Sequence, residues 1–202
     1  MSNTTTADTA AHPDLKIAFI IGSRREGRFA PVVAEWFTTL ATEHGGIELD
    51  IIDIADLELP GTHPDWGTPR TPELAALAAR VDAADGFVVL TPEYNHSFPA
   101  SLKNFIDLHR TEWQAKAVGF VSYGGAGGGL RAVEQLRLVF AELHCTSIRE
   151  SVSFHAGWDH FGEGGKAYDV NGAVGAAKVM LDQLIWWARA LRTARATHPY
   201  GG

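Results

Sequence analysis

The sequence is short of cysteine, of positive charge and of long apolar runs, and each shortage excludes a class of protein. With Cys145 as the only cysteine, neither an internal disulfide nor a cysteine-rich zinc site can form. Lys and Arg number 17 against 24 Asp and Glu, which gives a net charge of −7. That balance argues against a protein that binds nucleic acids or membrane surfaces through a basic face. Any anion site must therefore be local.

The longest apolar stretches are strand-sized and fall short of the roughly 20 residues that a membrane helix needs. No apolar signal core follows the N-terminus, so we expect a cytoplasmic protein. Residues 1–14 are small and polar, which predicts a disordered tail. The length of 202 residues, 46% of them hydrophobic, favours one domain. We place it at 15–195, with a short C-terminal tail at 196–202.

Short β-rich runs alternate with amphipathic helical patterns throughout this domain. The expected strands are 15–22, 47–54, 86–91, 117–124 and 146–154, and the helical patterns cover 33–40, 74–81, 102–109, 133–143 and 179–191. Strict alternation predicts an α/β fold, with a parallel sheet and helices on both faces. Because the fifth strand alternates in polarity, it suits an edge. Five such strands favour a flavodoxin-like three-layer sandwich of strand order 2-1-3-4-5.

In such a sheet, ligands bind beyond the carboxyl ends of the strands, where the strand order reverses. Here the reversal falls between the first and third strands, with the fourth alongside. Three loops should therefore carry the function, and they follow Ile21, Leu90 and Val121.

The first of these loops, "GSRREGR" at 22–28, has the groups that receive a phosphate. It offers a hydroxyl, three guanidinium groups and backbone N–H groups at the start of a helix. Neither G-x-G-x-x-G nor G-x-x-x-x-G-K-[ST] follows the strand, so no glycine cradle with lysine is expected. We expect Ser23, Arg25 and Arg28 to bind an anion and Arg24 to point to solvent. The alternative is a solvated basic turn.

The second loop, "TPEYNHSFP" at 91–99, is held in a defined turn by its two prolines. Rigid backbone donors and acceptors can read the polar edge of a planar heterocycle, and Tyr94 adds an aromatic surface. The alternative is a Pro-Asn turn with a tyrosine that faces the core. His96 is expected to form hydrogen bonds within the turn rather than to act as a catalytic base.

The third loop, "SYGGAGGG" at 122–129, contains five glycines in eight residues. Glycine favours a backbone that passes close to a ligand or adopts positive φ, so a flat ring can lie against this loop. The alternative is a flexible linker, which the position at the end of a central strand argues against.

The three loops in this order resemble the NADPH-dependent FMN reductase family of flavodoxin-like quinone, azo and chromate reductases, over residues 15–192. The resemblance implies FMN as cofactor. The residues that match the family's phosphate contacts are Ser23, Arg25 and Arg28; those that match its isoalloxazine-binding turn are Pro92, Glu93, Tyr94 and Asn95; those that match its glycine-rich ring contact are Ser122, Tyr123, Gly124 and Gly125.

The resemblance further implies an enzyme that transfers a hydride from NADPH or NADH to flavin N5. Two electrons then pass to a small-molecule acceptor, such as a quinone, azo compound or flavin, in a ping-pong cycle. Because the flavin does the chemistry, we expect no catalytic side chain and no metal. The family is commonly dimeric or tetrameric, so a homodimer or homotetramer is expected. Trp158 and Phe161, in the glycine and aromatic loop after the fifth strand, are candidates to cover the ring.

Two alternatives stay open. One is a flavodoxin-type electron carrier that binds FMN without oxidising NAD(P)H, although arginines in the first loop favour the enzyme. The other is a reductase that supplies reduced flavin to a partner monooxygenase, or a biosynthetic enzyme that acts on one quinone-like metabolite.

Overall fold

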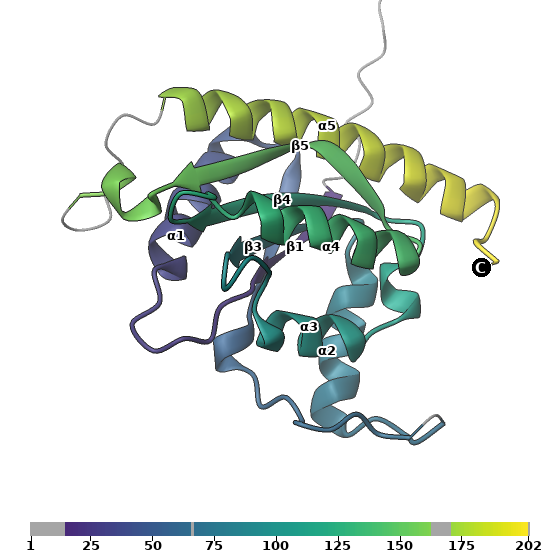
Figure 1. The fold of residues 1–202 in the computed structure, drawn as a ribbon. Helices are drawn as coiled ribbons and strands as arrows, with labels where there is room; N and C mark the ends of the chain where they lie inside the picture. Colours follow the sequence, from purple (N-terminus) through teal and green to yellow (C-terminus); the bar gives the residue numbers. More distant parts are fainter. Residues whose placement is uncertain (1–14, 66, 163–170, 202) are drawn as a thin grey trace, which may run out of the picture.

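The computed structural model describes residues 15–65, 67–162 and 171–201, so the predicted tail at 1–14 lies outside the described residues. A five-stranded parallel sheet of order β2-β1-β3-β4-β5 lies between two layers of helices (Figure 1). The strands are β1 (Leu15–Ile21), β2 (Ile47–Asp53), β3 (Gly86–Pro92), β4 (Ala117–Gly124) and β5 (Thr146–His155). The helices are α1 (Ala30–His44), α2 (Pro72–Ala83), α3 (Ala100–Asp107), α4 (Leu130–Glu142) and α5 (Asn171–Thr197). The predicted fold class, strand order and alternation are confirmed.

The burial of each strand follows from its place in the sheet. Every residue of β3 and β4 is buried, as is every residue of β1 except Lys16. Such continuous apolar runs are what a parallel strand needs when helices cover both of its faces. β5 lies at an edge, and its buried residues are interspersed with partly and fully exposed ones, as the sequence predicted.

Two hydrophobic cores flank the sheet. On one face α1 and α5 pack through residues such as Phe37 and Leu184, and on the other α2, α3 and α4 pack around Trp113 and Phe140 (Figure 1). Cys145 is buried in the second core, where it packs as a small apolar residue. Burial raises the pKa of its thiol well above the ordinary value, so this cysteine stays protonated.

Helix α5 is longer than its hydrophobic pattern indicated, because the turns on either side of the apolar segment carry small and polar residues. It ends at Thr197, two residues beyond the predicted domain boundary. Trp187 packs against the core, whereas Trp186 is 63% exposed. Among the described residues, no helix combines the length and apolar character needed to cross a membrane.

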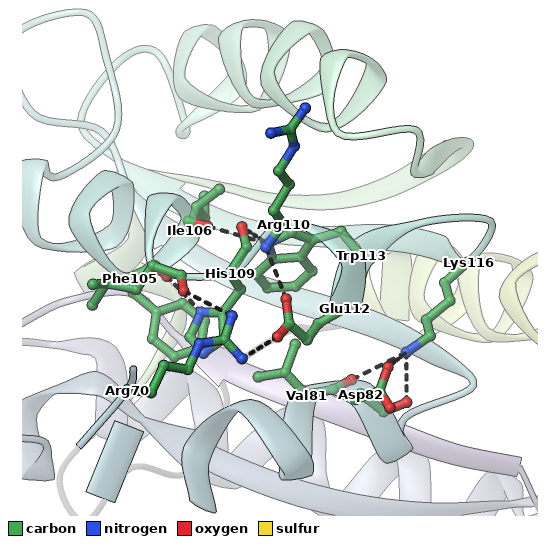
Figure 2. A network of polar contacts seen from close by, with 11 residues as sticks. Arg70, Val81, Asp82, Phe105, Ile106, His109, Arg110, Glu112, Trp113 and Lys116 are labelled. Carbon is green, nitrogen blue, oxygen red and sulfur yellow. Dashed lines mark hydrogen bonds and ion pairs between the residues drawn. The ribbon is translucent and has the colours of Figure 1, made fainter. Parts of the chain in front are cut away.

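A buried polar network holds the segment between α3 and β4 against α2 and against Arg70, which lies two residues before that helix (Figure 2). Glu112 accepts hydrogen bonds from the Arg70 guanidinium and, at 2.8 Å, from the backbone N–H of Arg110. Burial lowers the pKa of His109, whose Nδ1 lies 2.8 Å from the carbonyl oxygen of Phe105. Because buried charges need partners, this network fixes the start of β4 in register.

Lys116 completes the network at the C-terminal end of α2 (Figure 2). Its ammonium donates to the backbone carbonyls of Val81 and Asp82 at 3.3 and 2.6 Å, and it lies 5.5 Å from the ring centre of Phe87. The last carbonyls of a helix lack partners within the helix, and a lysine is a favourable donor to them. Burial nevertheless lowers the pKa of Lys116 to about 8.

This lowered pKa predicts how stability depends on pH. Between about 8 and the ordinary lysine value of 10.5, the unfolded chain binds more protons than the folded chain. Stability therefore gains from Lys116 as pH rises through this window, and the gain is absent below it. Relative to Lys116→Met, the wild type should gain on the order of 1–3 kcal/mol of unfolding free energy across the window.

Urea titrations at a series of pH values measure this difference, and groups common to both proteins largely cancel in it. The control is Lys103→Met, which removes an exposed lysine of α3 and should show no such trend. A difference between wild type and Lys116→Met that stays constant with pH would contradict the prediction.

Candidate cofactor site

The structure brings the three predicted loops together at the carboxyl ends of β1, β3 and β4. We call them loop 1 (22–29), loop 2 (93–98) and loop 3 (125–129). The backbone N–H of Gly22 donates to the carbonyl of Leu90 at 2.8 Å, and that of Glu93 donates to the carbonyl of Tyr123 at 3.1 Å. Loops 1 and 2 therefore leave their strands in positions fixed by the neighbouring strand.

A buried group of hydroxyls ties these strand ends together. Ser23 of loop 1 has no exposed surface, and its Oγ lies 3.1 Å from the phenol oxygen of Tyr94 in loop 2. Burial raises the pKa of the Tyr123 phenol well above its ordinary value, and the neighbouring Ser23 hydroxyl opposes this with a smaller effect. The Tyr123 phenol is thus a neutral hydrogen-bonding group. As placed, Ser23 links the loops rather than presenting its hydroxyl at the surface.

Arg28 also supports loop 1, by joining it to the end of β2. Its guanidinium forms a two-pronged ion pair with Asp53 at the end of β2, with N···O distances of 2.5 and 2.6 Å, and donates to the carbonyl of Ser23 at 2.7 Å. The hydrogen bond with Asp53 is the main reason why the pKa of Arg28 is raised. Asp53 in turn accepts from the backbone N–H of Ala55 at 3.0 Å. Arg28 therefore braces loop 1 against β2.

Arg24 and Arg25 lie on the outside of the same loop. Both are exposed, and within the described residues no hydrogen bond or ion pair engages either guanidinium. A 3.1 Å hydrogen bond from the N–H of Arg28 to the carbonyl of Arg25 closes the turn. α1 begins directly afterwards, and its N-cap residue, Phe29, supplies no side-chain cap. Loop 1 thus presents two free cations beside an uncapped helix start, where an anion is favoured.

Loop 2 forms a tight two-residue hairpin turn. Tyr94 and Ser97 exchange backbone hydrogen bonds of 2.8 and 3.0 Å, and the residues between them, Asn95 and His96, have φ values of 49° and 72°. Positive φ at both central positions is the mark of a type I′ turn. The expected defined turn is confirmed, and its tip is exposed. The carbonyl of His96, rather than its ring, forms the hydrogen bond seen here.

Glu93 joins loop 2 to the helix that follows loop 3. Its carboxylate accepts from the Arg131 guanidinium at 2.6 Å and from the Arg131 backbone N–H at 3.3 Å. The N-cap residue of α4 is Gly129, which has no side chain to satisfy the first N–H groups. Glu93 supplies the missing acceptor and a negative charge at the positive end of the helix.

The glycines of loop 3 differ in what surrounds them. A Cβ on Gly124 would lie 3.1 Å from the backbone nitrogen of Gly129, whereas a Cβ on Gly125 would meet only the Trp158 ring at 3.8 Å. Gly125 is exposed, so its backbone, unlike that of Gly124, can be reached from outside the loop. The carbonyl of Gly128 accepts from the hydroxyls of Ser122 and Ser153 at 2.9 and 2.8 Å. These bonds show an anchored loop and disfavour a flexible linker.

The two aromatic residues expected to cover a bound ring lie in different places. Trp158 is 58% exposed and stands beside Gly125. Phe161 is buried and packs edge-on against Phe29, with Trp36 also nearby, as part of the core. Only Trp158 therefore lies at the rim of the loops. The rest of this segment, 163–170, lies outside the described residues.

The histidines after β5 form hydrogen bonds with the backbone. Nδ1 of His155 lies 2.9 Å from the carbonyl of Ala126 in loop 3, and Nε2 of His160 lies 2.9 Å from the carbonyl of His155. Because a carbonyl only accepts, each of these nitrogens carries a proton. In the described ranges no three metal-ligating side chains gather in one place.

The arrangement just described matches a family known from sequence. A sequence profile of the NADPH-dependent FMN reductases matches residues 15–159, which include all three loops. The chain belongs to this family. The expected membership, and with it the assignment to the oxidoreductases, is confirmed.

Relatives of this NADPH-dependent FMN reductase family member include named oxidoreductases. It is 36% identical over 121 residues to an NAD(P)H-dependent FMN reductase of Schizosaccharomyces pombe, covering 56% of this chain and 60% of that protein, which is less than two thirds of its length. It is 34% identical to an NAD(P)H:quinone oxidoreductase of Solanum tuberosum, covering 67% and 73%, and 38% identical to a quinone reductase of Escherichia coli (strain K12), covering 64% and 71%.

Solved structures show the same fold. A flavoenzyme NAD(P)H:(acceptor) oxidoreductase from Paracoccus denitrificans superposes with a TM-score of 0.69 at 22% identity, covering 87% of this chain and 98% of that one. An NADH:FMN oxidoreductase in its apo form gives a TM-score of 0.65 at 20% identity, covering 92% and 97%. These likenesses support the flavodoxin-like architecture of this FMN reductase family member.

Three supporting residues were missed by the sequence analysis: Asp53, Arg131 and Gln135. Asp53 had a usable signal, because it is an acid at the carboxyl end of the strand beside β1. Arg131 had a weaker one, since a cation in the first turn of a helix opposes the helix dipole and needs a partner. Gln135, which contacts loop 2, lies within an ordinary amphipathic pattern and gave none.

The ion pair between Arg28 and Asp53 should stabilise the folded chain measurably. Asp53→Asn keeps an oxygen for the N–H of Ala55 but removes the charge facing Arg28. Because both side chains are largely buried, we expect a loss on the order of 1–3 kcal/mol in the free energy of unfolding, measured by urea denaturation.

The matched control is Asp50→Asn, which weakens the two-pronged pair with Arg80 on the surface. Those side chains are 40% and 43% exposed, so the expected loss is about 0–1 kcal/mol. Equal losses of unfolding free energy in the two variants would contradict the prediction, because the ion pair under loop 1 would then stabilise the chain no more than a surface pair does.

Proposed function

We propose that this chain is an FMN-dependent NAD(P)H oxidoreductase that binds FMN at the rim formed by loops 1, 2 and 3. The observation that carries the proposal is their convergence: two unengaged arginines, an exposed turn tip and an exposed glycine lie at the ends of three adjacent strands. Membership of the NADPH-dependent FMN reductase family supports the same cofactor.

The residues present suit a phosphate at one side of this rim. In a chain of net charge −7, Arg25 and Arg24 give loop 1 a local positive charge beside the uncapped start of α1. Arg25 is the preferred direct ligand, as expected from the family's motif. Ser23 and Arg28 act one layer deeper, where they hold the loop in the shape that presents these donors.

The other side of the rim suits a flat ring. Gly125 lacks a side chain, and a Cβ there would meet only the exposed Trp158 ring, so a planar system can approach the backbone of loop 3. Asn95, at the exposed tip of loop 2, offers backbone and side-chain groups to a heterocycle edge. The tip is held by the residues that lead into it from β3, which are Pro92, Glu93 and Tyr94.

Bound FMN supplies the chemistry, which is acceptance of a hydride from a nicotinamide at N5 and delivery of two electrons to an acceptor. The chain's own residues bind the cofactor, orient it and shield it from water. Burial raises the pKa of the Tyr123 phenol, so this group stays protonated at the end of β4. We assign no side chain as a catalytic acid or base, because positioning and electrostatics are the protein's contribution.

The acceptor class proposed is a quinone or a similar small molecule, as the names of the potato and Escherichia coli relatives suggest. NADPH and NADH are both candidate donors. A homodimer or homotetramer is proposed as well, for which the exposed Trp186 and Leu138 offer apolar contact area. The electron-carrier alternative is less favoured. Flavodoxins resemble one another in a phosphate loop rich in hydroxyl side chains, whereas loop 1 presents two free arginines.

The decisive experiment is an absorption spectrum of the protein reconstituted with FMN, followed by anaerobic mixing with NADPH and NADH in a stopped-flow instrument. Rapid loss of the flavin absorbance and its return on adding a quinone are expected. A bound flavin that neither nicotinamide reduces would make the chain a carrier, and absence of flavin binding would sink the proposal.

Arg25→Ala should weaken FMN binding through loss of a charge-assisted contact. We expect a loss on the order of 1.5–3 kcal/mol, or roughly 10- to 150-fold in Kd, measured by quenching of flavin fluorescence. Arg189→Ala removes the same charge from an exposed position on α5 near Gly46 and should leave Kd unchanged. Equal Kd values for wild type and Arg25→Ala would refute this phosphate contact.

Gly125→Val tests the ring side of the rim. Because the Cβ of the new side chain would meet only the Trp158 ring, at an ordinary contact distance, stability should change by less than about 1 kcal/mol while FMN affinity falls at least tenfold. Gly124→Val is the contrasting variant, since its side chain would press on the backbone of Gly129 and lower stability instead. A Gly125→Val protein that still purified yellow would place the ring elsewhere.

A further inference from the structure

The exposed turn of loop 2 has a backbone conformation that its own sequence does not favour. Asn95 and His96 both lie in the left-handed region, with φ values of 49° and 72°. Asparagine adopts this region readily, but a histidine carries a Cβ that disfavours it, and glycine is the usual partner at the second central position. Something outside the turn must therefore stabilise it.

The side-chain amide of Gln135 makes the contacts that the turn needs. Its Nε2 donates to the carbonyl of His96 at 2.9 Å, and its Oε1 accepts from the hydroxyl of Ser97 at 2.6 Å. One amide thus binds two successive residues of the turn through both of its polar ends. The helix beneath is held to the same loop, because the carboxylate of Glu93 caps α4 one turn earlier, at Arg131.

The two contacts are specific to this conformation of the turn. The His96 carbonyl and the Ser97 hydroxyl face one amide only while both central residues have positive φ, since rotation of this peptide to an extended conformation would carry the carbonyl away. A partly buried glutamine that lost these partners would leave polar groups unsatisfied. The left-handed turn and the Gln135 amide therefore support each other.

We propose that Gln135 is a positioning residue, whose amide holds the Tyr94–Ser97 turn in the left-handed shape in which the turn faces the cofactor. The inference rests on the proposed function, because it takes loop 2 to be part of the FMN site. Gln135 itself need not touch the flavin; it acts through Asn95 and His96.

The test combines Gln135→Met, which keeps the length of the side chain without its amide, with His96→Gly, which gives the turn the glycine that it lacks. Gln135→Met should raise the Kd for FMN about tenfold. His96→Gly serves as the reference background: adding Gln135→Met to it should change the Kd by less than about threefold, because glycine adopts the turn unaided.

A second readout needs no flavin. In the protein without added FMN, amide hydrogen exchange measured by NMR should be faster at Tyr94 and Ser97 in Gln135→Met than in wild type, and slow again in the double variant. Gln183→Met is the matched control: it removes another glutamine, which accepts from the backbone N–H of Glu150, and should alter neither readout.

Unchanged exchange and unchanged Kd in Gln135→Met would overturn the proposal, as would an effect of Gln135→Met on Kd that is as large in the His96→Gly background as in wild type. If the wild type did not bind FMN while the exchange pattern held, the proposed function would be wrong and the turn-holding role of Gln135 would stand. The two failures are thereby distinguishable.

Discussion

The shape of the candidate site depends on one partly buried contact, that of the buried Ser23 hydroxyl with the Tyr94 phenol, close to the buried Tyr123. The three residues come from the ends of β1, β3 and β4, which are adjacent in the sheet but far apart in the sequence. A parallel sheet brings its carboxyl ends to one edge but does not fix the loops beyond them. The hydroxyl contact does so, because a buried polar group without its partner would be costly.

Above this contact the site divides into a supporting layer and a presenting layer. Arg28 is committed to Asp53, and Glu93 is committed to Arg131, so neither charge is free for a ligand. The groups left to meet a ligand are those on the outside: the guanidinium of Arg25, the tip of loop 2 and the bare backbone at Gly125. Loop 1 of this acidic protein keeps a local positive charge, since Arg24 and Arg25 outnumber Glu26, the one carboxylate of that loop.

The fold was predictable because its signals are local and repeated: apolar strands and amphipathic helices alternate, and the polarity of β5 marks it as an edge. The loops were predictable from the topological rule, and the turn of loop 2 from its prolines. The roles within the loops were not, because they depend on side-chain direction. The sequence analysis treated Arg25 and Arg28 alike as anion ligands, and only the position of Asp53 separates these two. Gln135 lay outside every motif, since its partners are 38 and 39 residues away along the chain.

The shared support of loops 2 and 3 bears on how this scaffold can be altered. α4 follows loop 3, and Glu93 of loop 2 caps its first turn. Gln135, one turn further along α4, donates a hydrogen bond back to loop 2. Neither loop is thus an interchangeable module. A graft of loop 2 from another protein would arrive without its counterpart on the helix, so diversification of this rim has to exchange the hairpin and the first turns of α4 as one unit.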